Sequence, residues 1–99
     1  MVFDISIKNF DHASKDVTGT ATQLKTAKYS CKKGITIIND IDASGPVYIG
    51  NSDVTAGTNG PTDGYPLYPG REIFIGVKDP RVIYGITETG TITVFYIVE

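Results

Sequence analysis

Residues 34–50 read GITIINDIDASGPVYIG, and they contain two predicted strands with the turn between them. Residues 35–38 form a β-branched run, and β-branched side chains favour extended backbone. The run ends at Asn39-Asp40, and residues 42–46 that follow are typical turn formers. Because Pro46 has no N–H to donate, it fits only the start of the next strand, which we expect to end at Gly50.

The chain before this segment is predicted in three parts. Residues 3–8 alternate between apolar and polar side chains, which indicates a half-buried strand. Residues 9–19 are polar and are expected to form turns. Residues 20–33 fit neither the helical nor the strand period well; their threonines favour one or two short strands, with a single helical turn as the alternative.

The chain after this segment is predicted to be a long loop followed by three strands. Residues 51–70 are rich in Gly, Asn, Asp, Pro and Thr, and long loops in compact domains often carry function. The expected strands cover residues 72–77, 81–87 and 91–98, and the turns at 78–80 and 88–90 both fit hairpins. The strand at 91–98 is expected to be paired within the sheet or with a neighbour.

About seven short strands at intervals of roughly 8–12 residues are typical of an all-β fold. We therefore predict a single small antiparallel β-sandwich or barrel, with residues 1–99 forming one domain. Hydrophobic residues make up 40% of the 99 residues and charged residues 20%, which argues against charge-driven disorder.

Composition also bears on partners and compartment. No apolar run approaches the ~20 residues of a membrane helix, and Asp4, Ser6 and Lys8 interrupt the beginning of the chain, so we expect neither a membrane span nor a signal peptide. The net charge of −2 argues against binding to nucleic acid or to an anionic membrane. One cysteine and one histidine leave no internal disulfide and no Cys/His metal site, and no cofactor is expected.

No combination of acid, base and nucleophile appears, so we predict that the protein is not an enzyme and has no catalytic or metal-binding residues. His12 lies in a predicted turn, and Cys31 is expected to be a small buried residue although Lys32 and Lys33 beside it would favour a thiolate. Asp40 and Asp42 lack the other ligands of a calcium loop and are expected to cap turns.

Two groups of residues stand out as contact candidates. Lys25, Lys28, Lys32 and Lys33 cluster without an intervening acid, which fits either a solvated face or a contact with an acidic partner. In the long loop, Tyr65, Leu67 and Tyr68 fit three roles: a plug at the end of the sandwich, a protein interface, or a platform for sugar rings.

Residues 34–97 resemble small β-structured virion proteins of tailed bacteriophages. The resemblance rests on GITIIN at 34–39, GPVYIGNSDVTA at 45–56, GYPLYPG at 64–70 and GTITV at 90–94. Asp53 in the second motif is expected to accept hydrogen bonds from nearby backbone N–H groups, and Val54 to pack under the turn. These motifs indicate a shared scaffold and do not by themselves mark a site.

The resemblance implies a capsid decoration (cement) protein that binds the outer surface of the major capsid protein and stabilises the shell. It also implies a homo-oligomer, with a trimer among the expected states, made in the host cytoplasm and located on the virion. The candidate interface residues are Phe3, Ile5, Lys28, Lys32, Lys33, Tyr65, Leu67 and Tyr68.

Two alternatives stay open. One is a tail, baseplate or head-fibre module that attaches to the host surface. The other is a small carbohydrate-binding β-sandwich that uses Tyr65, Tyr68 or Tyr84 for stacking, although the absence of tryptophan weighs against it.

Overall fold

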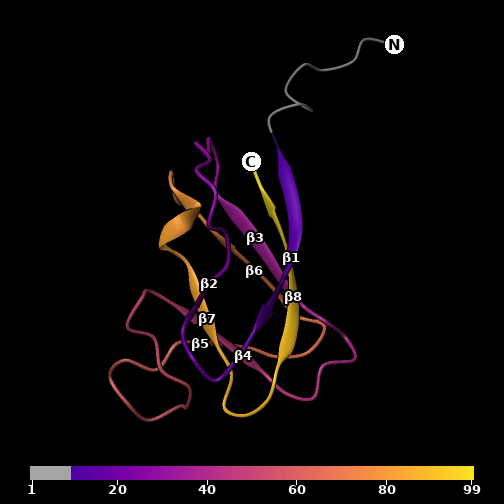
Figure 1. Ribbon diagram of the computed structural model, residues 1–99, viewed down its shortest axis with the longest axis vertical. Helices are drawn as coiled ribbons and strands as arrows, with labels where there is room; N and C mark the ends of the chain where they lie inside the picture. The colour runs from indigo at the N-terminus through magenta and orange to yellow at the C-terminus, as the bar shows by residue number, and fades with distance from the viewer. Residues whose placement is uncertain (1–9) are drawn as a thin grey trace.

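The computed structural model describes residues 10–99, which form two four-stranded antiparallel sheets (Figure 1). Sheet I has the strand order β1-β8-β3-β6, and sheet II has the order β2-β7-β4-β5. Within residues 10–99 each sheet has two edge strands, so of the two predicted forms, an antiparallel β-sandwich or a barrel, the structure is the sandwich. The elements are β1 (Asp11–Val17), β2 (Thr22–Gln23), β3 (Ile35–Asn39), β4 (Val47–Gly50), β5 (Tyr65–Leu67), β6 (Glu72–Ile75), the 3-10 turn η2 (Pro80–Val82), β7 (Tyr84–Ile86) and β8 (Ile92–Val98).

Strand β8 is an interior strand of sheet I and pairs with a strand on each side. It pairs with β1 along its full length, from Asp11 opposite Val98 to Val17 opposite Ile92, and with β3 on its other side. Strand β6 then pairs with β3 and forms the second edge. The expectation that the strand at 91–98 is paired is therefore confirmed.

The core lies between the two sheets and contains the inward-facing residues of both. In β3 and β8 every second residue is buried, as a strand with one face on a core requires. Burying a branched aliphatic side chain contributes about 1.5–3 kcal/mol, so these positions supply much of the stability. The core residues are Val17, Leu24, Cys31, Ile35, Ile37, Val47, Ile49, Leu67, Ile83, Ile92, Val94, Tyr96 and Val98.

Strand β3 begins directly after Gly34, where only glycine fits. Its φ of +148° lies in a region that L side chains rarely adopt. A Cβ atom there would collide with the carbonyl oxygen of Ile75 and lie 2.9 Å from the Cα atom of Gly76. This close approach lets the chain enter β3 beside the end of β6.

Both predicted hairpin turns are wrong, because each connects strands of different sheets. The chain leaves β6 in sheet I through residues 78–80 and enters β7 in sheet II; residues 88–90 then return it to β8 in sheet I. At the first crossover, Pro80 opens η2, and the Asp79 carboxylate caps it by accepting the Arg81 N–H at 3.0 Å. Crossovers and hairpins use the same turn-forming residues, so composition does not separate them.

Three other predictions of secondary structure differ from the structure. Residues 11–17 form β1 although they were predicted to be turns, because pairing with β8 satisfies their backbone groups while most of their side chains face solvent. Only Thr22–Gln23 becomes a strand in the region 20–33, and the predicted long loop contains the short strand β5. The strand predicted at 3–8 lies outside the described residues.

Candidate partner-binding surfaces

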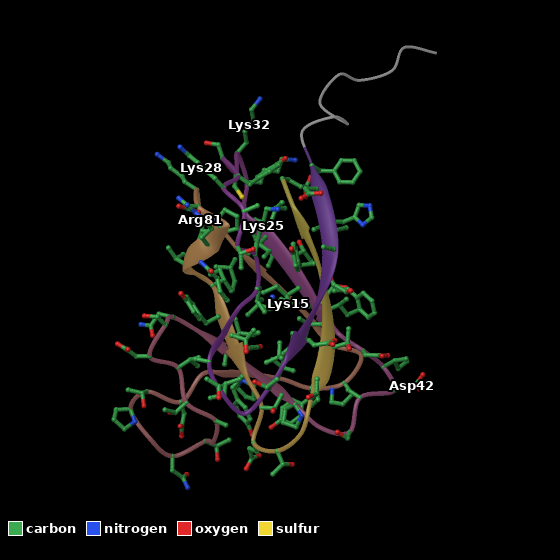
Figure 2. All side chains as sticks on the ribbon, in the orientation of Figure 1. Lys15, Lys25, Lys28, Lys32, Asp42 and Arg81 are labelled. Atoms are coloured by element: carbon green, nitrogen blue, oxygen red, sulfur yellow. The ribbon has the colours of Figure 1, made fainter. Side chains whose placement is uncertain are left out.

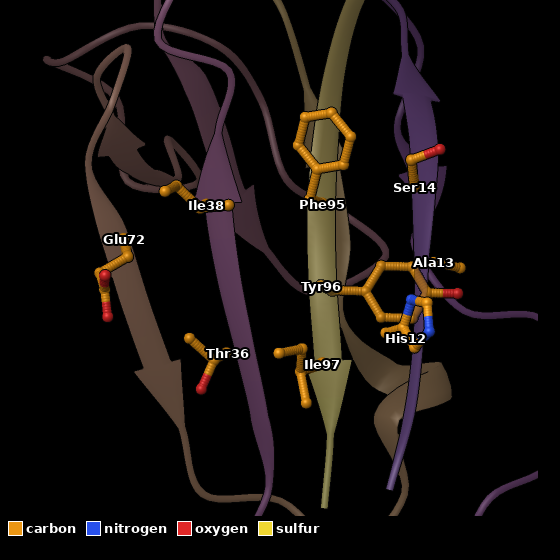
Figure 3. A pocket seen from close by; sticks show the side chains of 9 residues that line it. All are labelled: His12, Ala13, Ser14, Thr36, Ile38, Glu72, Phe95, Tyr96 and Ile97. Atoms are coloured by element: carbon orange, nitrogen blue, oxygen red, sulfur yellow. The ribbon is translucent and has the colours of Figure 1, made fainter.

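The outer face of sheet I points away from sheet II and carries large apolar side chains at its centre (Figure 3). The strand register arranges this face in two rows that cross the four strands. The Phe95 row contains Ser14, Phe95, Ile38 and Glu72, and the Ile97 row contains His12, Ile97, Thr36 and Phe74. We call Ile38, Phe74, Phe95 and Ile97 the apolar face.

The apolar face is exposed in the described chain. The exposed fractions are 38% for Ile38, 55% for Phe74, and 45% for both Phe95 and Ile97. An open groove of about 720 Å³ crosses these strands (Figure 3). A sheet with one face in water normally places polar residues there, so this face has the character of a contact surface.

Sequence reasoning missed the apolar face, although a signal was present. Residues 94–98 read VFYIV, five apolar side chains in succession. An uninterrupted apolar strand is typical of a strand covered on both faces. One face of β8 is covered by sheet II, and the other carries Phe95 and Ile97.

In these two rows, ionisable side chains lie only at the margins of the face, and the polar group on an interior strand is the Thr36 hydroxyl. Glu72 lies on the β6 edge, and Ser14 and His12 lie on the β1 edge (Figure 3). The rings of His12 and Phe10 stack with centroids 6.3 Å apart, which extends the apolar area beyond the Ile97 row. Among the residues that the structure describes, the centre of the face therefore has no charged group to desolvate when a partner covers it.

Four exposed lysines gather at one end of the sandwich: Lys28, Lys32, Lys33 and Lys78. We call them the basic end. The Cys31 N–H donates to the Lys78 carbonyl at 2.8 Å, which brings the chain around Lys32 and Lys33 next to Lys78. Figure 2 shows Lys28 and Lys32 at this end and Asp42 at the opposite end. Within residues 10–99 none of the four lysines forms an ion pair.

Lys25 does not belong to this exposed group. Its side chain is buried, and its ammonium donates to the Asp11 carboxylate at 2.8 Å. The ammonium also lies 5.6 Å from the centre of the Tyr29 ring, within cation–π range. The hydrogen bond with Asp11 raises the pKa of Lys25 against its burial, and the same bond lowers the pKa of Asp11. Lys25 therefore closes the side of the sandwich next to β1.

Arg81 also lies at this end, but its charge is used within the chain. Its guanidinium donates to both oxygens of Asp79, with the shortest distance 2.8 Å. Hydrogen bonds from the Arg81 side chain and backbone lower the pKa of Asp79 to about 2. The pair fixes the crossover at η2 and, among residues 10–99, leaves the four lysines as the basic groups available to a partner at this end.

The loop residues predicted as contacts divide into surface and core. Tyr65 and Tyr68 are exposed, and they border a groove of about 470 Å³ with Arg71 and Glu72. Leu67 is 1% exposed and belongs to the core, so its prediction as an interface residue is wrong. Tyr65 and Leu67 would share one face of an ideal strand, so alternation along β5 alone does not predict that Tyr65 is exposed and Leu67 buried.

The predicted contacts do not form one surface. The lysines lie at the basic end, whereas the two tyrosines lie on and beside β5, an edge strand of sheet II (Figures 1 and 2). Phe3 and Ile5 lie outside the described residues. The predicted contact residues therefore form two separate surfaces: the basic end, and an aromatic surface made of Tyr65 and Tyr68.

The two residues considered for nucleophilic catalysis lie apart. Cys31 packs in the core, and its burial raises the pKa of the thiol, so the thiolate is disfavoured despite the nearby lysines. His12 instead borders the outer groove of sheet I. In the part of the chain that the structure describes, no group of three or more His, Cys, Asp or Glu side chains is placed to hold a metal ion.

Acidic side chains of the loops cap turns. Asp40 accepts the Asp42 N–H at 3.0 Å, as predicted. Asp63 accepts the N–H groups of Asn59 and Gly60 and the Thr55 hydroxyl, and these bonds lower its pKa. This carboxylate therefore stabilises the loop between β4 and β5.

The turn in the GPVYIGNSDVTA motif is built differently from the prediction. The side-chain oxygen of Asn51 accepts the Asp53 N–H at 2.9 Å, so Asn51 takes the role expected of Asp53. Val54 is buried, and it packs against Gly50 and Gly64, as the motif implied. The motif is thus a scaffold for the loop.

Comparison of the chain with models of known protein families, with curated proteins and with solved structures gives no match. Among residues 10–99, no helix has the length and apolar character needed to cross a membrane.

Proposed function

We propose that this protein is a non-enzymatic structural protein of a phage virion, a decoration protein that binds the outer surface of the capsid through its basic end. The observation that carries the proposal is the gathering of Lys28, Lys32, Lys33 and Lys78 at one end of a chain with a net charge of −2. The resemblance of residues 34–97 to phage virion proteins supplies the class of partner.

The basic end suits an acidic, repeated surface. An acidic partner surface attracts the four lysines gathered at this end and steers association. The effect is strongest when the rest of the molecule is acidic, because the protein then approaches the partner in one orientation. A protein that binds only the assembled shell stabilises that shell by mass action.

Charge reversal at the basic end tests the proposal. The triple variant Lys28→Glu, Lys32→Glu, Lys33→Glu should bind capsids lacking this protein at least about tenfold more weakly than the wild type. A matched triple variant with arginine at these positions should bind normally, and so should Arg71→Glu, which changes the net charge away from the basic end. Wild-type binding should also weaken as salt concentration rises.

Saturable, high-copy binding with greater heat resistance of the shell would support the decoration role. Unchanged occupancy by the glutamate variant would contradict the role of the basic end. Failure of the wild type to bind shells would contradict capsid decoration and favour the tail, baseplate or head-fibre alternative.

A carbohydrate-binding role is the second candidate, and the aromatic surface favours it. Tyr65 and Tyr68 are 58% and 52% exposed, and Arg71 and Glu72 in the same groove offer hydrogen bonds to hydroxyl groups. Tyr84, predicted as a third stacking residue, is not in this groove. Binding on a glycan array that is lost in Tyr65→Ala and Tyr68→Ala would support this role; an array without signal would reject it.

A further inference from the structure

We propose that the apolar face of sheet I binds a second copy of this chain, forming a two-fold symmetric dimer whose axis runs parallel to the strands of sheet I. This inference does not depend on the proposed function, because the basic end lies outside the apolar face.

The chemistry of the face favours a copy of itself over a charged partner. Its centre is made of Phe95, Ile38 and Ile97 with the uncharged Thr36, and the polar residues Ser14 and Glu72 lie at opposite edges. An acidic or basic partner would have to desolvate its charges against these side chains at a cost. A second apolar face removes both surfaces from water together.

The register makes the face complementary to itself. A two-fold axis parallel to the strands keeps each row at the same position along the strand direction and reverses the order of the strands. Strand β8 of one copy therefore lies over β3 of the other. Phe95 then lies over Ile38 of the second copy, and the same contact occurs twice. Ile97 likewise comes over Thr36 in the neighbouring row. Two such sheets would pack about 10 Å apart.

The same axis pairs the polar margins. It places β1 of one copy over β6 of the second copy, so Ser14 lies opposite Glu72. His12 lies in the row next to this pair. The serine hydroxyl and the imidazole can both donate to a carboxylate. An axis across the strands would place β6 over β6 and bring the two Glu72 side chains towards each other. Hydrogen bonding to Glu72 and the separation of the two Glu72 carboxylates therefore favour the axis along the strands, which also sets the two basic ends at the same end of the dimer.

The size of the face fits a small interface. Four strands spaced ~4.8 Å apart, with the longer ones about seven residues long, span roughly 20 by 23 Å. This footprint lies below the ~800 Å² that each partner buries in a standard interface. We therefore expect a reversible dimer with a dissociation constant on the order of micromolar.

Sedimentation equilibrium of the full chain, from about 1 μM to about 500 μM, tests the dimer. The wild type should pass from monomer to dimer in this range, and Ile38→Ser and Phe95→Ser should each weaken association about tenfold or more. Both side chains point outward, so the core is not altered. Ile41→Ser is the matched control: Ile41 is 77% exposed, lies outside the face, and should leave association unchanged.

A charge exchange tests the register. Glu72→Lys should weaken the dimer by removing the acceptor at the β6 edge, and Ser14→Glu added to Glu72→Lys should restore it. Circular dichroism checks that each variant is folded. Failure of the second substitution to restore association would overturn the proposed axis.

The remaining outcomes also decide the proposal. A wild-type monomer over the whole range, a trimer, or a dimer unaffected by Phe95→Ser would overturn it. If the wild type is monomeric and Phe95→Ser loses capsid binding, the face belongs to the capsid protein instead. The lysine-reversal variant should still dimerise, so failure of the proposed function and failure of this inference remain distinguishable.

Discussion

Lys25 and Asp11 form an asymmetric ion pair at the residue scale. The lysine side chain is 8% exposed and the aspartate side chain is 49% exposed. Removing Asp11 leaves an ammonium group with little access to water, whereas removing the lysine charge leaves a carboxylate that water can solvate. The two halves of this pair should therefore contribute differently to stability.

We expect Asp11→Ala to lower the free energy of unfolding by about 1–3 kcal/mol, because it leaves a buried charge without its partner. Lys25→Met keeps the aliphatic packing and should cost at most about 1 kcal/mol. Urea denaturation of the two variants measures the difference. A larger loss in Lys25→Met would contradict this explanation.

Asp79 gives a prediction for acid stability. Its pKa is lowered to about 2 from an ordinary value of 3.8, so the folded protein binds this proton less readily than the unfolded chain. Its contribution is present above pH ~3.8 and is lost as the pH falls towards ~2.

The variant Asp79→Asn keeps an acceptor for the Arg81 N–H but loses the charge. Its free energy of unfolding should depend less on pH than that of the wild type over this range, and the two proteins should approach each other at the acid end. Parallel acid dependence of the two proteins in urea titrations would rule out this role of Asp79.

At the scale of elements, Gly34 controls the entry into β3. We expect Gly34→Ala to lower the free energy of unfolding by about 2–4 kcal/mol, because the methyl group would separate the start of β3 from Ile75. Gly45→Ala is the matched control: no atom lies within 4 Å of its added Cβ, and its effect should stay within about 0.5 kcal/mol. Thermal and urea unfolding measure both variants, and equal losses would argue against the steric explanation.

The strands that could be predicted from the sequence are those whose residue pattern can be recognised without knowing which strands they pair with. The β-branched run 35–38 identifies β3 without reference to any other strand. Strand β1 could not be found this way, because Asp11–Val17 is mostly polar and becomes a strand only by pairing with β8. The crossovers were missed for a related reason: residues 78–80 and 88–90 determine that the chain turns, and the partners of the flanking strands determine which sheet it enters.

The candidate surfaces were predictable to different degrees. The lysines are near one another in sequence, so Lys28, Lys32 and Lys33 could be grouped, but Lys78 joins them only through the backbone hydrogen bond with Cys31. The apolar face draws residues from β3, β6 and β8, and it appears only when the register is known. Its one local signal is the apolar run at 94–98.

At the scale of the whole molecule, the apolar face links stability to protein concentration. If two copies associate in the folded state alone, the midpoint of thermal unfolding should rise as concentration increases. Phe95→Ser should show a smaller rise over the same range, although its midpoint at high dilution should be close to that of the wild type. Differential scanning calorimetry over a hundredfold range of about 5–500 μM makes the comparison. A concentration-independent midpoint in the wild type would count against the dimer.

The position of β8 also has a consequence for how the chain acquires its structure during synthesis. This strand lies between β1 and β3 in sheet I, yet both neighbours precede it in the chain. While the ribosome is still making residues 92–98, β1 lacks the strand with which it pairs in residues 10–99, and the edge of β3 that pairs with β8 is open. Such distant pairings slow folding, to milliseconds or seconds in comparable all-β domains. Sheet I is thus completed by its central strand, and the nascent chain depends on the polar character of β1 to stay free of aggregation until then.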